Sequence, residues 1–227
     1  MNVPPTDRPV VSIVDDELSV LRSIEYALAS LGAQIEAHTS AEDFLRTYRR
    51  GRIACLLVDY VLPGVSGLEL IEKLTDDPGL QIVMISGRGT IASAVSAMKS
   101  GAIEYLEKPY TADSLQSAVT TALRRHQAFR KKQVKVEARQ KRLETLSDEE
   151  KAVIAASATG DTVKEIAARL DISVRTVHMR LSSAMKKTQT QNKIELIKLA
   201  CCQPQPATES DQAQVPVTDR RLDSASE

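Results

Sequence analysis

The chain has 227 residues, of which 42% are apolar, and its 30 acidic and 30 basic side chains give a formal net charge of zero. This length allows one large domain or two small ones. No apolar run approaches the ~20 residues that span a bilayer, and no basic segment followed by an apolar core opens the chain, so we expect a cytoplasmic protein with no membrane partner. The cysteines, Cys55 and the adjacent Cys201 and Cys202, match neither a disulfide scaffold nor a zinc site.

The charge is distributed unevenly along the chain. Residues 1–120 hold 16 acidic and 10 basic residues, a net of −6, whereas residues 121–200 hold 9 acidic and 18 basic, a net of +9. Residues 201–227 return to a net of −3, with 5 acidic and 2 basic residues. Two domains with different partners are indicated, and the basic one is a candidate for binding nucleic acid.

Five apolar runs within residues 10–110 predict the strands of a parallel sheet. Several are nearly continuous and rich in Val, Ile and Leu, as in strands that are covered on both faces. Amphipathic stretches with helical spacing separate them, and a fifth helix begins near Asp113. Five such units in this order predict a doubly wound, flavodoxin-like α/β domain. The predicted strands cover residues 10–14, 34–37, 54–58, 81–85 and 102–106.

The rest of the chain changes character. After residue 125 the helical pattern becomes highly charged with a thin apolar stripe, which predicts a partly exposed linker helix. Short helical patterns without a strand follow, and then a proline-containing polar tail that we expect to be disordered. The predicted boundaries are a flexible N-terminus 1–8, an α/β domain 9–125, a linker helix 126–143, a four-helix domain 144–202 and a disordered tail 203–227.

Polar residues gather where the predicted strands end. Because the carboxyl ends of parallel strands share one edge of a sheet, these side chains should converge there. Close carboxylates repel unless a cation lies among them, and oxygen ligands with room for water suit Mg²⁺. An ammonium and a hydroxyl beside them predict a site for a phosphoryl group on Asp59. The residues concerned are Asp15, Asp16, Asp59, Ser86, Glu107 and Lys108.

Residues 10–125 resemble the receiver domain of response regulators. The motifs that carry the resemblance are "VSIVDDE", "LLVDYVLPGVSGLEL" and "VMISGRGTIASAVSAMKSGAIEYLEKPY". The resemblance implies that Asp59 is the phosphoacceptor, that Asp15, Asp16 and Asp59 hold Mg²⁺, and that the Lys108-Pro109 peptide is cis. It further implies that Lys108 pairs with the phosphate, with Ser86 as the switch hydroxyl and Tyr105 as the switch aromatic.

Residues 162–187 show a helix–turn–helix pattern, with a turn at Asp171-Ile172 and a second helix from Ser173. At 100° per residue, Val174, Val177, Leu181, Ala184 and Met185 fall on one face of this second helix. The opposite face is basic and rich in hydroxyl groups, as contacts in a major groove require, and two basic residues flank it. The predicted DNA contacts are Arg175, Thr176, Met179, Ser182, Ser183 and Lys186, with Arg180 and Lys187 at the flanks.

Residues 143–200 resemble the DNA-binding domain shared by the LuxR, NarL and FixJ regulators, and the chain as a whole resembles a FixJ-type regulator. "LETLSDEEKAVI" and the pairs Ile166-Ala167, Ile172-Ser173 and Thr176-Val177 carry this resemblance. It implies a non-enzymatic transcription regulator that receives phosphate from a sensor histidine kinase, dimerises, binds duplex DNA and loses phosphate by slow autodephosphorylation. RNA polymerase is a further partner that such an output permits.

Two other functions are alternatives to this one. An aspartyl-phosphate hydrolase would need a second acid two residues after the nucleophile, where Val61 stands. A sigma-like or RNA-binding output remains an alternative, because small helical modules are reused, and protection of duplex DNA without polymerase would distinguish it.

Overall fold

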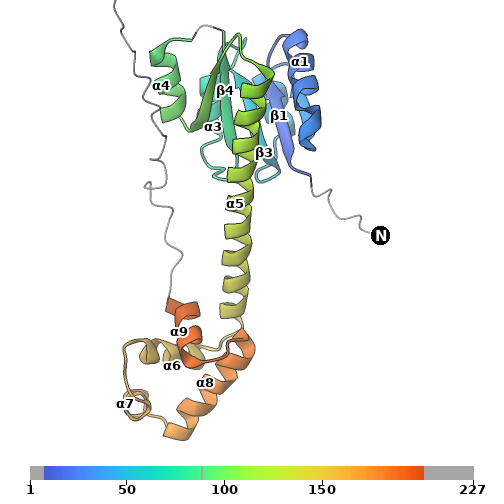
Figure 1. The fold of residues 1–227 in the computed structure, drawn as a ribbon. Helices are drawn as coiled ribbons and strands as arrows, with labels where there is room; N and C mark the ends of the chain where they lie inside the picture. The colour runs from blue at the N-terminus through green and yellow to red at the C-terminus, as the bar shows by residue number, and fades with distance from the viewer. Residues whose placement is uncertain (1–7, 88, 202–227) are drawn as a thin grey trace, which may run out of the picture. The chain divides into compact units, whose positions relative to one another are not determined.

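The computed structural model describes residues 8–87 and 89–201, and the chain divides between Val134 and Lys135 into two compact units. The first unit is a sheet of five parallel strands in the order β2-β1-β3-β4-β5. Helices cover both faces of this sheet (Figure 1). The predicted doubly wound, flavodoxin-like architecture is therefore confirmed. The strands are β1 Val10–Val14, β2 Gln34–His38, β3 Ile53–Asp59, β4 Gln81–Ser86 and β5 Ala102–Glu107.

The helices of this unit begin at the polar caps that the sequence indicates. Ser40 accepts a hydrogen bond from the Asp43 N–H, and Ser66 forms a reciprocal capping box with Glu69. A short 3₁₀ turn, Ala29–Leu31, follows the first helix and ends at Gly32, whose φ is +67°. The helices are α1 Leu18–Leu28, α2 Ala41–Thr47, α3 Gly67–Lys73, α4 Ile91–Lys99 and α5 Ala112–Glu144.

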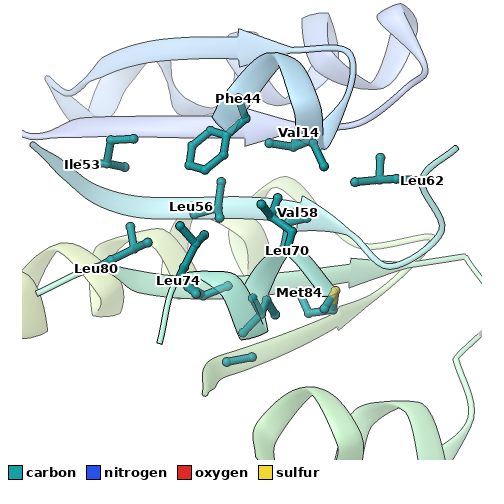
Figure 2. Close-up of a cluster of buried hydrophobic side chains, with 14 of the residues drawn as sticks. Val14, Phe44, Ile53, Leu56, Val58, Leu62, Leu70, Leu74, Leu80 and Met84 are labelled. Atoms are coloured by element: carbon teal, nitrogen blue, oxygen red, sulfur yellow. The ribbon is translucent and has the colours of Figure 1, made fainter. Parts of the chain in front are cut away.

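The sheet separates two hydrophobic clusters, because side chains alternate between the faces of a strand. On β3, Leu56 and Val58 point to the cluster that contains Phe44 of α2 and Leu70 of α3 (Figure 2). Cys55 and Leu57 point the other way, to the cluster formed with α1 and α5. Burial on both faces explains why the strand reads as a continuous apolar run.

Residues 126–143, the predicted linker helix, are helical and continue the fifth helix without a break. α5 is one helix of 33 residues that contains this segment. Its sequence has no Gly or Pro and is rich in Ala, Gln, Lys and Arg, which all favour helix, so nothing interrupts it.

The second unit contains the helices α6 Asp148–Ala158, α7 Val163–Arg169, α8 Val174–Thr188 and α9 Lys193–Cys201. They pack around a cluster that includes Ile154, Ile166, Val177 and Leu196. Between α7 and α8 the chain turns at Asp171, which adopts a positive φ of 51°. The predicted helix–turn–helix is confirmed.

The predicted flexible segment 1–8, apart from Arg8, and the predicted disordered tail 203–227 lie outside the described residues. Within the part of the chain that is described, none of the helices is long and apolar enough to cross a membrane.

Candidate functional site

Two strand ends bring Asp15 and Asp59 together at the carboxyl edge of the sheet. β1 and β3 are parallel neighbours with Val14 opposite Val58, so the residues that follow these positions emerge side by side. Lys108, directly after β5, reaches both: its Nζ lies 2.8 Å from Asp15 Oδ2 and 2.9 Å from Asp59 Oδ1. The side chains of Asp15 and Asp59 are 2% and 8% exposed, so these three predicted residues form one buried cluster.

Burial and the neighbouring Lys108 have opposite effects on the pKa of Asp59. Loss of water raises the pKa of Asp59 above its ordinary value, and the nearby ammonium group of Lys108 offsets this only in part. For Lys108, burial lowers the pKa, but the hydrogen bond to Asp15 and the negative charges of Asp15 and Asp59 outweigh burial and the pKa is raised overall. The lysine therefore stays charged at neutral pH, next to a poorly solvated carboxylate that has the character of an activated nucleophile.

The four carboxylate oxygens of this cluster are not equally satisfied. Asp15 Oδ1 accepts from the Glu17 N–H at 2.9 Å, and Asp15 Oδ2 accepts from Lys108. Asp59 Oδ2 accepts from the Val61 N–H at 3.0 Å. Asp59 Oδ1 is buried and receives no aligned hydrogen bond, although Lys108 Nζ lies 2.9 Å away. Since a buried oxygen without a hydrogen bond is costly, this atom has capacity for a further ligand.

The donor set fits Mg²⁺, which binds through one or two carboxylates and keeps several waters. Asp15 and Asp59 supply the carboxylates, and Oδ1 of Asp59 is the unsatisfied donor atom. Asp16, the third predicted ligand, is exposed. Across the described ranges, no three His, Cys, Asp or Glu side chains are arranged to hold a metal ion. The protein therefore offers two preformed carboxylates rather than a closed metal cage.

Of the two charged residues at the end of β5, Lys108 joins the buried cluster and Glu107 does not. Glu107 is exposed and does not join the buried cluster, in contrast to the expected convergence of the strand-end carboxylates. The Lys108-Pro109 peptide bond is cis, which agrees with the expectation.

The predicted switch residues lie on the two strands beyond β3. Ser86 ends β4 and is fully buried, and Asp59 lies opposite Ile85 in the neighbouring strand pair, so Ser86 is close to Asp59, the predicted phosphoacceptor, along the same sheet edge. Tyr105, on β5, is half-buried, and its hydroxyl lies 3.1 Å from Ser93 Oγ. Ser93 is the third residue of α4 and belongs to the capping box of that helix. The sequence interpretation missed this contact, which ties Tyr105 to the start of α4.

In the second unit, α8 packs one side against its neighbours. The buried residues are Val177, Leu181, Ala184 and Thr188. Val174 was expected on the buried side but is 41% exposed, because the helix begins there and its core contacts start one turn later.

The opposite side of α8 carries most of the predicted DNA contacts. Met179, near its centre, is 65% exposed. Thr176 and Arg180 are partly buried, and the Thr176 hydroxyl lies 2.8 Å from Ser173 Oγ at the helix start. His178 is also exposed, but at 100° per residue it lies beside Met185, at the border of the apolar face. The predicted contact residues that are exposed are Arg175, Met179, Ser182, Lys186 and Lys187.

Ser183 and Lys187 have a partner inside the protein. Glu150, in the first turn of α6, is only 5% exposed and accepts hydrogen bonds from Ser183 Oγ at 2.7 Å and Lys187 Nζ at 2.9 Å. A third donor, the Ser147 N–H, lies 2.8 Å from the same carboxylate and completes a capping box. The S-x-x-E spacing of Ser147 and Glu150 signals this box in the sequence, but not the reach of Glu150 to another helix.

Comparisons with known proteins agree with both halves of the chain. Residues 11–120 match the response regulator receiver domain family, and residues 144–200 match the family of bacterial regulatory proteins of the luxR type. Nodulation protein W of Bradyrhizobium diazoefficiens is 33% identical over 92% of each chain. The transcriptional regulatory protein FixJ of Rhizobium meliloti is 34% identical over 84% of this chain and 94% of its own.

A solved structure, that of the response regulator StyR, superposes with a TM-score of 0.78 at 33% identity, over 85% of this chain and 98% of its own. Receiver and luxR-type domains in one chain imply a sensor kinase as partner and DNA as ligand. The chain therefore belongs to the FixJ-type response regulators, and it is a phosphorylation-controlled transcriptional regulator.

Proposed function

We propose that Asp59 is the residue that accepts the phosphoryl group from a histidine of the partner kinase. The observation that carries this proposal is the buried Oδ1 atom without an aligned hydrogen bond, 2.9 Å from Lys108 Nζ. A carboxylate oxygen of Asp59 attacks phosphorus, the phosphorus–nitrogen bond breaks, and the imidazole leaves after taking up a proton.

The neighbouring charges prepare the site for the incoming phosphate. Asp15 and Asp59, with Asp16 as a further carboxylate, would hold Mg²⁺, which would supply positive charge that offsets the phosphoryl oxygens. Lys108 is charged and within reach of Asp59, so it can follow the phosphoryl group as an ion-pair partner. Slow attack of water then returns Asp59 to its free form.

The test is labelling by a small phosphodonor such as acetyl phosphate in the presence of Mg²⁺. Asp59→Asn should abolish acid-labile incorporation, because an amide cannot form the acyl phosphate. Asp76→Asn is the matched control, since Asp76 is exposed on the same unit and outside the cluster. Undiminished labelling of Asp59→Asn would contradict the assignment.

We propose further that Ser86 and Tyr105 report phosphorylation to α4 and promote dimerisation. Tyr105 already contacts Ser93 in the first turn of α4. The outer side of that helix exposes an apolar row, with Ile91 87%, Val95 46% and Met98 49% exposed. Spacing of four and three residues places this row on one side of the helix, next to β5, as a homodimer face would require. If Ser86→Ala still dimerises fully when labelled, this route is wrong.

The second unit is proposed to place α8 in the major groove. Arg175, Met179, Ser182 and Lys186 are the exposed candidates for base and backbone contacts, and the apolar end of Met179 suits a thymine methyl group. Thr176 and Arg180 lie at the edge, where contacts to phosphate are expected. A dimer would favour a near-palindromic site with half-sites about one helical turn apart. Contact with RNA polymerase and a cytoplasmic location stay predictions.

The luxR-type match favours duplex DNA over the sigma-like or RNA-binding alternative. Footprinting of the phosphorylated protein on duplex DNA without polymerase tests this choice. Protection that appears only with polymerase, or only on RNA, would support the alternative.

A further inference from the structure

The first unit contains a cavity of about 830 Å³ at the end of the sheet opposite Asp59. Its wall is formed by the chain around Val10, where β1 begins, by the segment around Arg52 before β3, and by α5 from Thr120 to Arg130. Val10, Leu31 and Leu123 provide an apolar floor. The size falls within the ~300–1,000 Å³ range of pockets that hold small organic ligands.

The cavity is lined by positively charged side chains and by no negatively charged ones. Its lining includes Arg8, Arg52, Arg124 and Arg130, and no acidic residue lines it. Arg52 pairs with Glu36. In the part of the chain that the structure describes, no ion pair is found for the other three arginines. Cations gathered around a concave surface repel one another, so an anionic occupant would be stabilised there.

Two further groups give the cavity hydrogen-bonding capacity. His126 Nδ1 lies 2.7 Å from the Gly79 carbonyl oxygen, and since a carbonyl only accepts, Nδ1 carries the proton and the ring is held in place. Gln127 is exposed on the same wall, and its amide can both donate and accept.

We propose that this cavity binds a nucleoside di- or triphosphate. Guanidinium groups form paired hydrogen bonds with phosphate oxygens, and three arginines without a carboxylate partner match a chain of phosphates. A single phosphate would leave the apolar floor and most of the volume unused. A planar base covers that floor, and the Gln127 amide offers a partner for its polar edge. The site lies at the far end of β1 from Asp15, and neither Asp15 nor Asp59 lines it.

The experiment is a calorimetric titration of the full chain with ATP, GTP and inorganic triphosphate, in chelator so that no metal is bound near Asp59. Arg124→Ala/Arg130→Ala removes two cavity arginines from α5. Arg125→Ala/Lys131→Ala is the matched control, because it removes the same charge from exposed residues of the same helix that do not line the cavity. Thermal melting verifies that both variants are folded, and Arg124→Gln/Arg130→Gln provides a second cavity variant.

At least one nucleotide should bind the unchanged chain and the control equally, and the cavity variants at least tenfold more weakly. Inorganic triphosphate should bind at least tenfold more weakly than the nucleotide, because it cannot use the apolar floor. The proposal is overturned if neither nucleotide binds, if the control loses as much affinity as the cavity variants, or if triphosphate binds as tightly as the nucleotide. A loss of duplex DNA binding in the cavity variants without nucleotide binding would assign the arginines to nucleic acid and overturn it as well.

Discussion

Replacing Glu150 with alanine is expected to destabilise the second unit and to free α8 from α6. The carboxylate is almost fully buried and accepts hydrogen bonds from three donors. These are Ser183 Oγ at 2.7 Å, Lys187 Nζ at 2.9 Å and the Ser147 N–H at 2.8 Å.

The size of the effect follows from these contacts. A hydrogen bond to a charged group contributes ~1.5–3 kcal/mol. The Lys187 side chain is 40% exposed, so water weakens its ion pair and we take the lower end of that range. With the lost cap, the free energy of unfolding of this unit should fall by about 3–5 kcal/mol. Lys187→Ala should cost less, and the double-mutant cycle should show a coupling of about 1–2 kcal/mol between the two residues.

Hydrogen exchange followed by mass spectrometry suits this test, because the chain has no tryptophan to report on the second unit. Peptides from α8 of the full chain should exchange at least about 100-fold faster in Glu150→Ala, since every ~1.4 kcal/mol is a factor of ten. Peptides from β3 should be unchanged. Unchanged exchange in α8 would refute the reasoning.

Lys186 and Lys187 are adjacent, and comparing them in DNA binding tests whether Glu150 holds Lys187 away from DNA phosphates. Lys186 is exposed, whereas Lys187 is paired with Glu150. Lys186→Ala should therefore lower the slope of log affinity against log salt by ~0.9, and Lys187→Ala should leave the slope nearly unchanged while increasing exchange in α8. An equal fall in slope for both variants, with α8 still protected, would return Lys187 to the phosphate contacts.

The contact also has a pH dependence. Burial raises the pKa of Glu150, but the hydrogen bonds of Lys187 and Ser183 outweigh it and the pKa lies below the ordinary value of 4.5. A lowered pKa in the folded state means that the carboxylate contributes stability above pH 4.5, and that this contribution is lost as the pH falls through the folded-state pKa. Protection of α8 should decrease over that acidic range in the unchanged chain, and the decrease should be smaller in Glu150→Ala.

Three further outcomes are expected. Burial raises the pKa of the Cys55 thiol to about 12, so iodoacetamide at pH 8 should modify exposed Cys201 and spare Cys55 until the chain unfolds. Peptide mass spectrometry measures the modification of each cysteine, and early modification of Cys55 would contradict this expectation. Asp16→Asn should slow acetyl phosphate labelling and raise the Mg²⁺ concentration needed, and an unchanged Mg²⁺ dependence would remove Asp16 from the metal set. Ile91→Glu should prevent dimerisation of the labelled protein in light-scattering measurements, whereas Tyr26→Glu, an equally exposed change on α1, should not; dimers of Ile91→Glu would rule out the α4 face.

The sequence predicts the positions of Asp15 and Asp59 well, because neighbouring parallel strands end at the same edge of a sheet. Once β1 and β3 are recognised as buried parallel strands, Asp15 and Asp59 must emerge at the same edge. The position of Lys108 follows from the end of β5. The sequence does not predict that Asp59 Oδ1 is the oxygen without an aligned hydrogen bond. That outcome depends on side-chain rotamers and on backbone donors such as the Val61 N–H, which a residue pattern does not specify.

A helical projection of α8 alone does not reveal the contacts that its residues make with other helices. At 100° per residue, Ser183 and Lys187 face away from the apolar stripe of α8. Their outward position still leaves them within reach of Glu150, because α6 packs along α8 and places a buried carboxylate beside them. The charged segment 126–143 is helical, as its sequence pattern predicts, because neither Gly nor Pro interrupts α5 there.

Each unit thus buries a carboxylate beside a lysine, and the remaining contacts distinguish the reactive one from the structural one. Both oxygens of Glu150 accept hydrogen bonds, and the pKa of Glu150 is lowered, so the charged form is already satisfied. Asp59 keeps one buried oxygen without an aligned hydrogen bond, and the pKa of Asp59 is raised. A carboxylate in the first state gains nothing from a new ligand, whereas one in the second state is stabilised by a cation or by bond formation to phosphorus. The same residue pair therefore positions a helix in one unit, and in the other it has the properties that the proposed phosphoryl acceptor requires.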